Sequence, residues 1–169
     1  MKGIICSCIV CWLMTTCAAQ PLVTTFEQSE GKETATYFEC IRYYKQLDAA
    51  YNTIRMLPFD TTDAGYPLHL VLFSSNAGFN PNEWCNQHKV VIMINNGIHP
   101  GEPDGIDASM MLLRDLASRK IRPPANVVLA VIPVYNIGGC LNRSSFYRAN
   151  QNGPTSYGFR GNAQNLDLN

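Results

Sequence analysis

Residues 90–134 limit the possible folds of this chain more than any other segment. The apolar run VVIMI at 90–94 is followed by a helical pattern over 104–119, and a second apolar run, VVLAVIPV, lies within 126–134. A strand, a helix and a strand in this order form a βαβ unit, in which the strands are parallel and the crossover is right-handed. Because hydrophobicity along each strand is continuous rather than alternating, both strands are predicted to be buried on both faces.

A further helix is predicted over residues 35–51, upstream of this unit. Thr36 and Glu39 match the capping box that begins a helix, and apolar side chains recur at helical spacing after them. Two short strands follow at 54–58 and 68–73, and the turn-forming residues between them predict a hairpin. The order of these elements predicts an α/β fold with a mixed, largely parallel sheet and helices on both faces.

The remaining segments are predicted to be irregular. Residues 74–88 contain four asparagines and one glycine together with Pro81, which predicts a loop, and residues 135–141 form a glycine-rich turn. Residues 142–169 are rich in arginine and asparagine and contain almost no aliphatic side chain before Leu166. A long loop of this kind inside a compact domain is usually functional.

The composition excludes one broad class of partner. With 46% hydrophobic and 15% charged residues, the chain is typical of a globular domain. Its formal net charge is zero and its sequence contains no basic stripe. Binding to nucleic acid requires such a stripe to neutralise phosphates, so nucleic acid is not an expected partner.

Residues 1–19 have the organisation of a secretory signal peptide. Lys2 is followed by an apolar run to Met14 and then by small residues. Cleavage before Gln20 leaves residues 20–169 as the mature domain, which we expect to be secreted or periplasmic. The apolar run is too short to cross a bilayer as a helix, so no stable membrane span is expected. A lipid anchor on Cys17 is the alternative interpretation.

His99 and Glu102 lie in the polar turn between the first strand of the βαβ unit and its helix. Open α/β sheets bind ligands beyond the carboxyl ends of their strands, which is where this turn is expected. Imidazole and carboxylate groups are zinc ligands, and Pro100 and Pro103 stiffen the backbone around them. The pair predicts two ligands of a zinc site, although a chance pair or a glutamate that favours the helix start explains the pattern too.

Two segments of the chain resemble one family. NNGIHPGEPDGIDASMMLLRDL is similar to the zinc-binding region of metallocarboxypeptidases, whose motif is His-x-x-Glu after a buried strand, and Pro-Gly-Glu resembles a secreted bacterial branch. The ending NLDLN resembles the start of the family segment Asp-x-Asn-Arg-Asn-Phe. The resemblance covers about residues 36–169 and implies a carboxypeptidase-like fold, of which this chain holds the N-terminal part.

The resemblance implies roles for the matching residues around a zinc ion. His99 and Glu102 correspond to two zinc ligands, so Zn²⁺ is the implied cofactor. Asp167 corresponds to the carboxylate that orients the zinc-bound histidine. His69 and His88 match nothing in the family, and a structural or solvent-exposed position is expected for both.

Further matches concern the substrate. Arg148 most resembles the arginine that polarises the scissile carbonyl and stabilises its oxyanion, with Arg143 and Arg160 as alternative candidates. Asn169 corresponds to an asparagine that binds the terminal carboxylate of the substrate. Many family members carry an arginine inside the zinc motif, where this chain has Pro100 and Gly101, so the preferred C-terminal residue stays open.

The implied function is zinc-dependent hydrolysis of C-terminal peptide bonds, with peptide or protein C-termini as partners. The third zinc histidine and the general-base glutamate of the family have no counterpart in the sequence. Residues 20–169 are therefore interpreted as the N-terminal part of a catalytic domain, inactive by itself. Two alternatives stay open: a zinc-dependent deacylase-type amidohydrolase, which shares His-x-x-Glu, and a non-catalytic fragment or binding domain.

Overall fold

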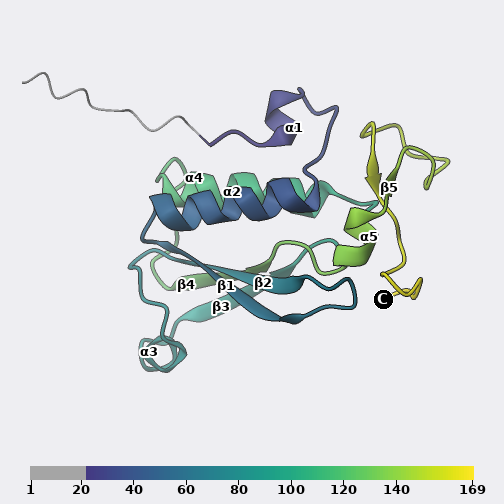
Figure 1. Ribbon diagram of the computed structural model, residues 1–169. Helices are drawn as coiled ribbons and strands as arrows, with labels where there is room; N and C mark the ends of the chain where they lie inside the picture. Colours follow the sequence, from purple (N-terminus) through teal and green to yellow (C-terminus); the bar gives the residue numbers. More distant parts are fainter. Residues whose placement is uncertain (1–21) are drawn as a thin grey trace, which may run out of the picture.

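The computed structural model describes residues 22–169. The predicted signal peptide and Cys17 lie outside the described residues. A single mixed sheet with helices packed against it forms the centre of the described chain (Figure 1). None of the helices between residues 22 and 169 is both long enough and apolar enough to cross a membrane.

The sheet has the strand order β1-β2-β4-β3. Its strands are β1 (Ile54–Thr61), β2 (Pro67–Ser74), β3 (Val90–Asn95) and β4 (Val127–Ile132). β3 and β4 are parallel, as the βαβ pattern predicts, whereas β1 with β2 and β2 with β4 are antiparallel. The mixed α/β sheet is confirmed. The expected predominance of parallel pairing is wrong for these strands, because half of them come from a hairpin, which is antiparallel by construction.

Two helices lie on the same face of the sheet, α2 (Tyr37–Ala50) and α4 (Asp104–Ala117) (Figure 1). The predicted capping box of α2 is confirmed, since Thr36 N donates to Glu39 Oε2 at 2.8 Å and Glu39 N donates to Thr36 Oγ1 at 3.4 Å. The largest fully buried side chains of the core between these helices and the sheet include Tyr44, Leu47, Ile106, Met110, Leu113 and Val131.

The other face of the sheet is covered in part by the short helix α3 (Pro81–Asn86). Trp84 packs there against Leu72, Val128 and Ala130. The prediction of a loop over residues 74–88 was therefore wrong in its middle. Asn80 caps the helix by accepting from Asn82 N at 3.0 Å, and Pro81 occupies the first helical position, where its missing N–H has no cost.

β3 lies at the end of the strand order, with β4 as its neighbour. Val90, Val91, Ile92 and Met93 are 51%, 48%, 44% and 63% exposed. The prediction that this strand is buried on both faces was therefore wrong. Its apolar composition fits a central strand, but within residues 22–169 no strand pairs with its outer edge, and side chains on both of its faces are exposed.

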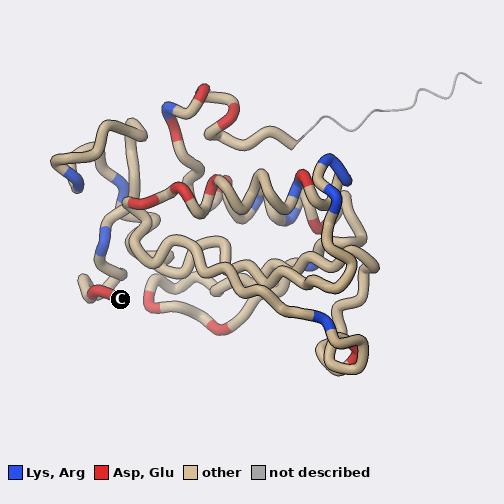
Figure 2. Tube along the Cα trace, turned by 180° about the vertical axis from the view of Figure 1, so that it is seen from behind, with Lys and Arg blue, Asp and Glu red and all other residues tan. Residues whose placement is uncertain are grey.

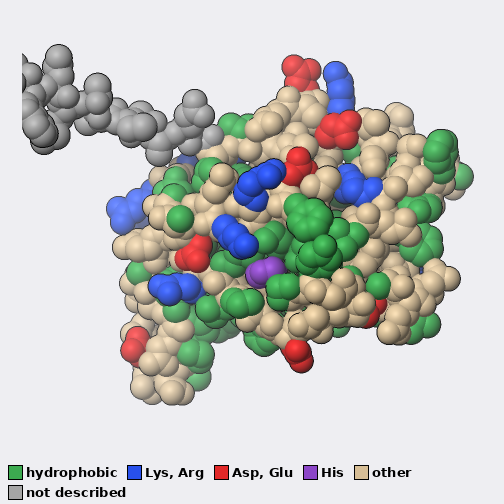
Figure 3. Space-filling view, viewed as in Figure 1, with side chains coloured by type: hydrophobic (Ala, Val, Ile, Leu, Met, Phe, Trp, Pro, Cys, Tyr) green, Lys and Arg blue, Asp and Glu red, His purple; other side chains and the backbone are tan. Residues whose placement is uncertain are grey.

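The start of α2 and the tip of the hairpin are joined by aromatic side chains. The rings of Tyr37, Phe38 and Tyr66 meet edge to face, with centroids 5.3–5.6 Å apart. Figure 3 shows hydrophobic side chains gathered on this face of the molecule, near α2 and the hairpin. Edge-to-face packing adds to the stabilisation from burial, so this cluster fixes the hairpin against the helix.

The segment after β4 begins with a short helix, α5 (Ile137–Leu141), where the sequence predicts only a glycine-rich turn. Asn136 starts this helix, because its Oδ1 accepts from Gly139 N at 2.8 Å. Two short strands follow, β5 (Arg143–Ser144) and β6 (Tyr157–Gly158), which pair with each other. The rest of residues 142–169 is irregular, as predicted, and Figure 2 shows basic positions spaced along it.

Arg114 of α4 forms hydrogen bonds that attach the N-terminal segment to α4. This segment contains the short helix α1 (Thr25–Gln28). Arg114 Nη1 donates to Glu27 Oε2 at 2.6 Å and to the carbonyl of Leu22 at 2.9 Å. Its Nε donates to Asp115 Oδ1 at 2.8 Å. The hydrogen bond from Arg114 holds the pKa of Glu27 below its ordinary value.

Replacing Arg114 with alanine should lower the free energy of unfolding by about 2 kcal/mol, because charge-assisted bonds are lost at a largely buried guanidinium. Urea denaturation measures this change, with the exposed Arg122→Ala as a control within about 0.5 kcal/mol of wild type. The pKa of Glu27 is lowered on folding, so the ionised Glu27 stabilises the folded state above pH 4.5. This stabilisation is lost as the pH falls through the pKa of Glu27 in the folded state. The difference between wild type and R114A should therefore narrow in acid, and a difference independent of pH would contradict this assignment.

Candidate functional site

The turn that follows β3 lies beyond the carboxyl ends of β3 and β4, as predicted. The backbone of this turn pairs with the segment after β4, since Tyr135 N donates to Asn96 O at 2.8 Å and Asn136 N donates to Gly97 O at 3.0 Å. Gly97 has a φ of +65°, and a Cβ at this position would lie 3.1 Å from Ile106 Cδ1. Glycine therefore allows the chain to turn sharply while it packs against α4.

His99 and Glu102 lie within this tight turn, in which Glu102 N donates to the carbonyl of His99 at 2.8 Å. Both residues line a hollow of about 350 Å³ together with Asn169. The remaining lining residues are Asn95, Asn96, Gly97, Ile98 and Gly105. The structure thus brings the predicted ligand pair and the predicted substrate-binding asparagine to one concave surface.

Asp167 contacts the Nε2 atom of the His99 ring. Asp167 Oδ1 lies 2.8 Å from His99 Nε2, and its Oδ2 accepts from Arg160 Nε at 2.8 Å. The hydrogen bonds from His99 and from Arg160 lower the pKa of Asp167 to about 2. Because this carboxylate is ionised at neutral pH and can only accept, the neutral form of the His99 ring has its proton on Nε2 and its lone pair on Nδ1.

Arg148 is placed beside Glu102. Its Nη2 donates to Glu102 Oε1 at 2.5 Å, and this hydrogen bond holds the pKa of Glu102 below its ordinary value. The backbone near Arg148 is held by the buried Tyr157, whose hydroxyl accepts from Arg148 N at 3.1 Å and donates to Ser145 O at 3.0 Å. Glu102 is consequently an anion near neutral pH, with a cation in contact.

The two alternative arginines have other partners. Arg143 Nη2 donates to the carbonyls of Ser156, at 2.5 Å, and of Thr34, at 3.3 Å, so it links the last segment to the start of α2. Arg160 supports Asp167, as described above. Of the three candidate arginines, Arg148 is the one in contact with a predicted metal ligand.

His99 and Glu102 are the two predicted metal ligands, and both line the same hollow. Among residues 22–169, no group of three or more histidine, cysteine, aspartate or glutamate side chains is placed to hold a metal ion. His69 is buried in β2 and its Nδ1 has no hydrogen-bond partner, whereas His88 is exposed. Both fit the structural or solvent-exposed positions expected for them.

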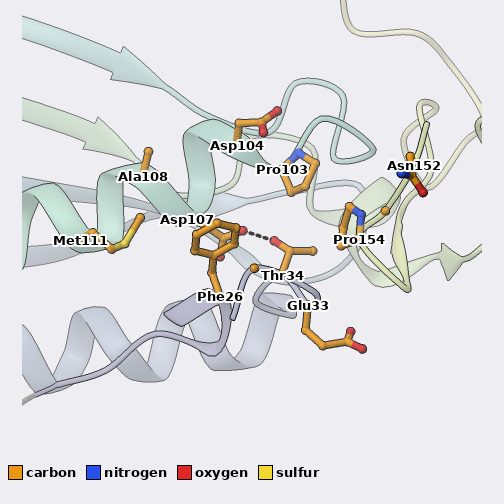
Figure 4. Close-up of a pocket in the computed structure, with 12 residues that line it drawn as sticks. Phe26, Glu33, Thr34, Pro103, Asp104, Asp107, Ala108, Met111, Asn152 and Pro154 are labelled. Atoms are coloured by element: carbon orange, nitrogen blue, oxygen red, sulfur yellow. Dashed lines mark hydrogen bonds between the residues drawn. The ribbon is translucent and has the colours of Figure 1, made fainter. Parts of the chain in front are cut away.

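A second cavity of about 330 Å³ lies beside the first turns of α4 (Figure 4). Phe26, Pro103 and Met111 provide apolar walls, and Thr34 donates a hydrogen bond to the buried Asp107. Burial raises the pKa of Asp107 in spite of this bond. None of the predicted site residues lines this cavity, and Asp107 uses its carboxylate to join α4 to the segment before α2.

Buried residues that the sequence analysis did not single out support the site. Asn136 is 1% exposed and contacts the backbone of two loops, at Ile98 and at Arg160. Asn96 is also buried and donates to Ser109 Oγ of α4 at 2.9 Å. The available signal was an asparagine shortly after an apolar strand and directly before Ile-Gly-Gly, which is typical of a helix cap.

Comparison with solved structures shows which fold these elements form. The metallo-carboxypeptidase from Burkholderia cenocepacia matches with a TM-score of 0.58 at 17% identity, over 80% of this chain and 32% of its own. Bovine thrombin-activatable fibrinolysis inhibitor, solved in complex with tick carboxypeptidase inhibitor, matches with a TM-score of 0.56 at 14% identity, over 78% of this chain and 38% of its own. Carboxypeptidase A from Helicoverpa armigera matches with a TM-score of 0.54 at 17% identity, over 63% of this chain and 25% of its own.

These likenesses show that the chain has the fold of the metallocarboxypeptidases, which confirms the fold implied by the sequence resemblance. The chain spans 25% to 38% of the length of these structures. A scan of family models and a search of curated proteins find no match. At such low identities the likeness establishes the fold, and the roles of individual residues depend on the geometry of the site.

Proposed function

We propose that residues 20–169 are the N-terminal part of the catalytic domain of a secreted or periplasmic, zinc-dependent metallocarboxypeptidase, which removes residues from peptide or protein C-termini. The observation that supports this most directly is the hydrogen bond between His99 Nε2 and Asp167 Oδ1, 2.8 Å long. A histidine that binds a metal usually donates its other ring N–H to a carboxylate in this way. The contact links the two sequence segments on which the family resemblance depends.

The donor set fits zinc in its chemistry. His99 Nδ1 and the Glu102 carboxylate are the atoms that would hold the ion, and both side chains line the same hollow. Zinc, when bound, supplies a Lewis acid that polarises a carbonyl group and acidifies water. Asp167 contributes by holding the proton of His99 at Nε2, so that Nδ1 is free to act as a ligand.

Arg148 and Asn169 are proposed to act on the peptide. The guanidinium of Arg148 reaches Glu102 with one Nη atom, and its remaining N–H groups can donate to a carbonyl oxygen that becomes negative in the transition state. Asn169 lines the hollow, where its side-chain amide can donate to the terminal carboxylate of a substrate. Both groups are positioned by loops after β4, so substrate contacts depend on residues 142–169.

Zinc titration of the purified chain against a chromophoric chelator tests this function. We expect one zinc ion per chain, bound more weakly than in sites with three protein ligands. Glu102→Gln should lower the affinity about 10-fold or more, because it removes a charged ligand, whereas the exposed neighbour Asp104→Asn should leave it near wild type. Equal affinities in the two variants would contradict the assignment of Glu102.

Hydrolysis of peptides by the same preparation separates the proposal from its rivals. Zinc binding without hydrolysis would favour the non-catalytic alternative for residues 20–169. Release of C-terminal amino acids from a longer form that includes these residues supports the carboxypeptidase. Hydrolysis of N-acyl amino acids in place of peptides would identify a deacylase-type amidohydrolase.

A further inference from the structure

Asn136 is buried at the junction of the two loops that carry the candidate metal centre. It lies just beyond β4 and is 1% exposed, and its side-chain amide makes three hydrogen bonds, in which both N–H groups and the carbonyl oxygen have partners. Oδ1 accepts from Gly139 N at 2.8 Å. Nδ2 donates to the carbonyl of Ile98 at 3.2 Å and to the carbonyl of Arg160 at 2.9 Å.

The two carbonyl groups that Asn136 joins are next to the residues of the His99–Asp167 contact. The carbonyl of Ile98 belongs to the peptide bond that leads into His99. Arg160 is the residue whose Nε donates to Asp167 Oδ2 at 2.8 Å. One amide group therefore sets the separation between the backbone that carries His99 and the backbone that supports its carboxylate partner.

The ion pair between Arg160 and Asp167 is too exposed to fix that separation alone. The side chains of Arg160 and Asp167 are 51% and 46% exposed. Exposed ion pairs contribute little because water and salt screen them. Hydrogen bonds at a buried amide are more costly to lose, since a buried group that loses its partner cannot bond to water instead.

We propose that Asn136 is a positioning residue for His99. Its side chain bridges the Ile98 and Arg160 carbonyls and so keeps His99 and Asp167 at hydrogen-bonding distance. The consequence of this bridge for a bound metal rests on the function proposed above. The bridge itself does not, because it joins groups that are present in the metal-free protein.

Asn136→Asp separates bridging from helix capping. Aspartate and asparagine are equally good caps, so the bond from Gly139 N to a side-chain oxygen at this position is retained. The carboxylate has no N–H group to donate, and its second oxygen would face two carbonyl oxygens. Asn142→Asp is the matched control: Asn142 Oδ1 accepts from Tyr147 Oη at 2.7 Å, which a carboxylate can also do.

Nitrogen-15 NMR of the metal-free chain tests the bridge. In wild type and N142D we expect His99 to be the Nε2–H tautomer with a slowly exchanging ring proton. In wild type we also expect both Nδ2 protons of Asn136 to be protected from exchange. In N136D the ring proton of His99 should exchange about 10-fold faster, equivalent to the loss of about one hydrogen bond. An unchanged His99 signal in N136D, or unprotected Asn136 amide protons in wild type, would overturn the proposal.

Two further measurements complete the test. Zinc affinity should fall about 10- to 100-fold in N136D and stay unchanged in N142D. If wild type fails to bind zinc, the proposed function is contradicted. The NMR result still shows whether the Asn136 bridge positions His99. If N136D does not fold, Asn136→Ser, which also caps the helix, takes its place. Loss of the folded circular dichroism spectrum in both variants would assign Asn136 to the fold and overturn the positioning role.

Discussion

Replacing His99 with alanine is expected to lower the zinc affinity of the chain by about 100-fold or more. Loss of a residue that merely orients a ligand lowers metal affinity about 10- to 100-fold, so loss of the ligand itself should reach or exceed the upper value. The effect should be large here because His99 and Glu102 are the two candidate donors that the structure brings together. Chelator competition at fixed pH measures it.

The matched control for this prediction is His88→Asn. His88 is exposed and has a φ of +51°, a backbone conformation that asparagine tolerates better than alanine does. Zinc affinity should be unchanged in H88N, and far-UV circular dichroism should be the same in both variants. If H99A and H88N lose zinc affinity equally, zinc binds non-specifically to histidine side chains, and the assignment of His99 as a ligand is wrong.

The second large effect is expected for Gly139→Ala. A Cβ at Gly139 would lie 2.4 Å from the Phe159 carbonyl oxygen and 2.7 Å from that of Gly161. Both atoms belong to the backbone, so the irregular segment that carries Arg160 must move away and the bond from Phe159 N to Gly139 O, 2.8 Å long, must break. We expect a loss of about 3 kcal/mol in the free energy of unfolding, the upper range for overpacking.

Urea denaturation and amide hydrogen exchange measure this change. Protection of Phe159 should fall first, because its N–H bonds directly to Gly139. Gly78→Ala is the control, since a Cβ there would make only an ordinary contact of 3.4 Å with the side chain of Asn76. Wild-type stability together with wild-type protection in G139A would show that the close approach of these two segments is not required.

Local signals predicted much of the fold. The capping box of Thr36 and Glu39 and the short turn of the β1–β2 hairpin depend on residues a few positions apart, and both are found. α3 was missed because Asn80 and Pro81, which are loop-forming in one context, begin a helix in another. Exposure of β3 could not be predicted, since an apolar run does not reveal which strands lie beside it.

The same distinction applies to the site. His99 and Glu102 are separated by two residues, and their turn can be recognised within one segment of sequence. The contact between His99 and Asp167 spans 68 positions, and the sequence suggested it only through a family resemblance. The bridge made by Asn136 joins residues 38 and 24 positions away and follows no periodic pattern, so it is seen only when the backbone is folded.

The exposed strand β3 has a consequence for handling this chain in solution. Charged side chains and prolines protect edge strands from pairing with other molecules. Residues 90–94 contain neither. Among residues 22–169 no strand pairs with their outward edge, which lies beside apolar side chains that are 44–63% exposed at positions 90–93. Preparations of residues 20–169 should therefore self-associate as concentration rises, and a lysine at position 92 should keep them dispersed.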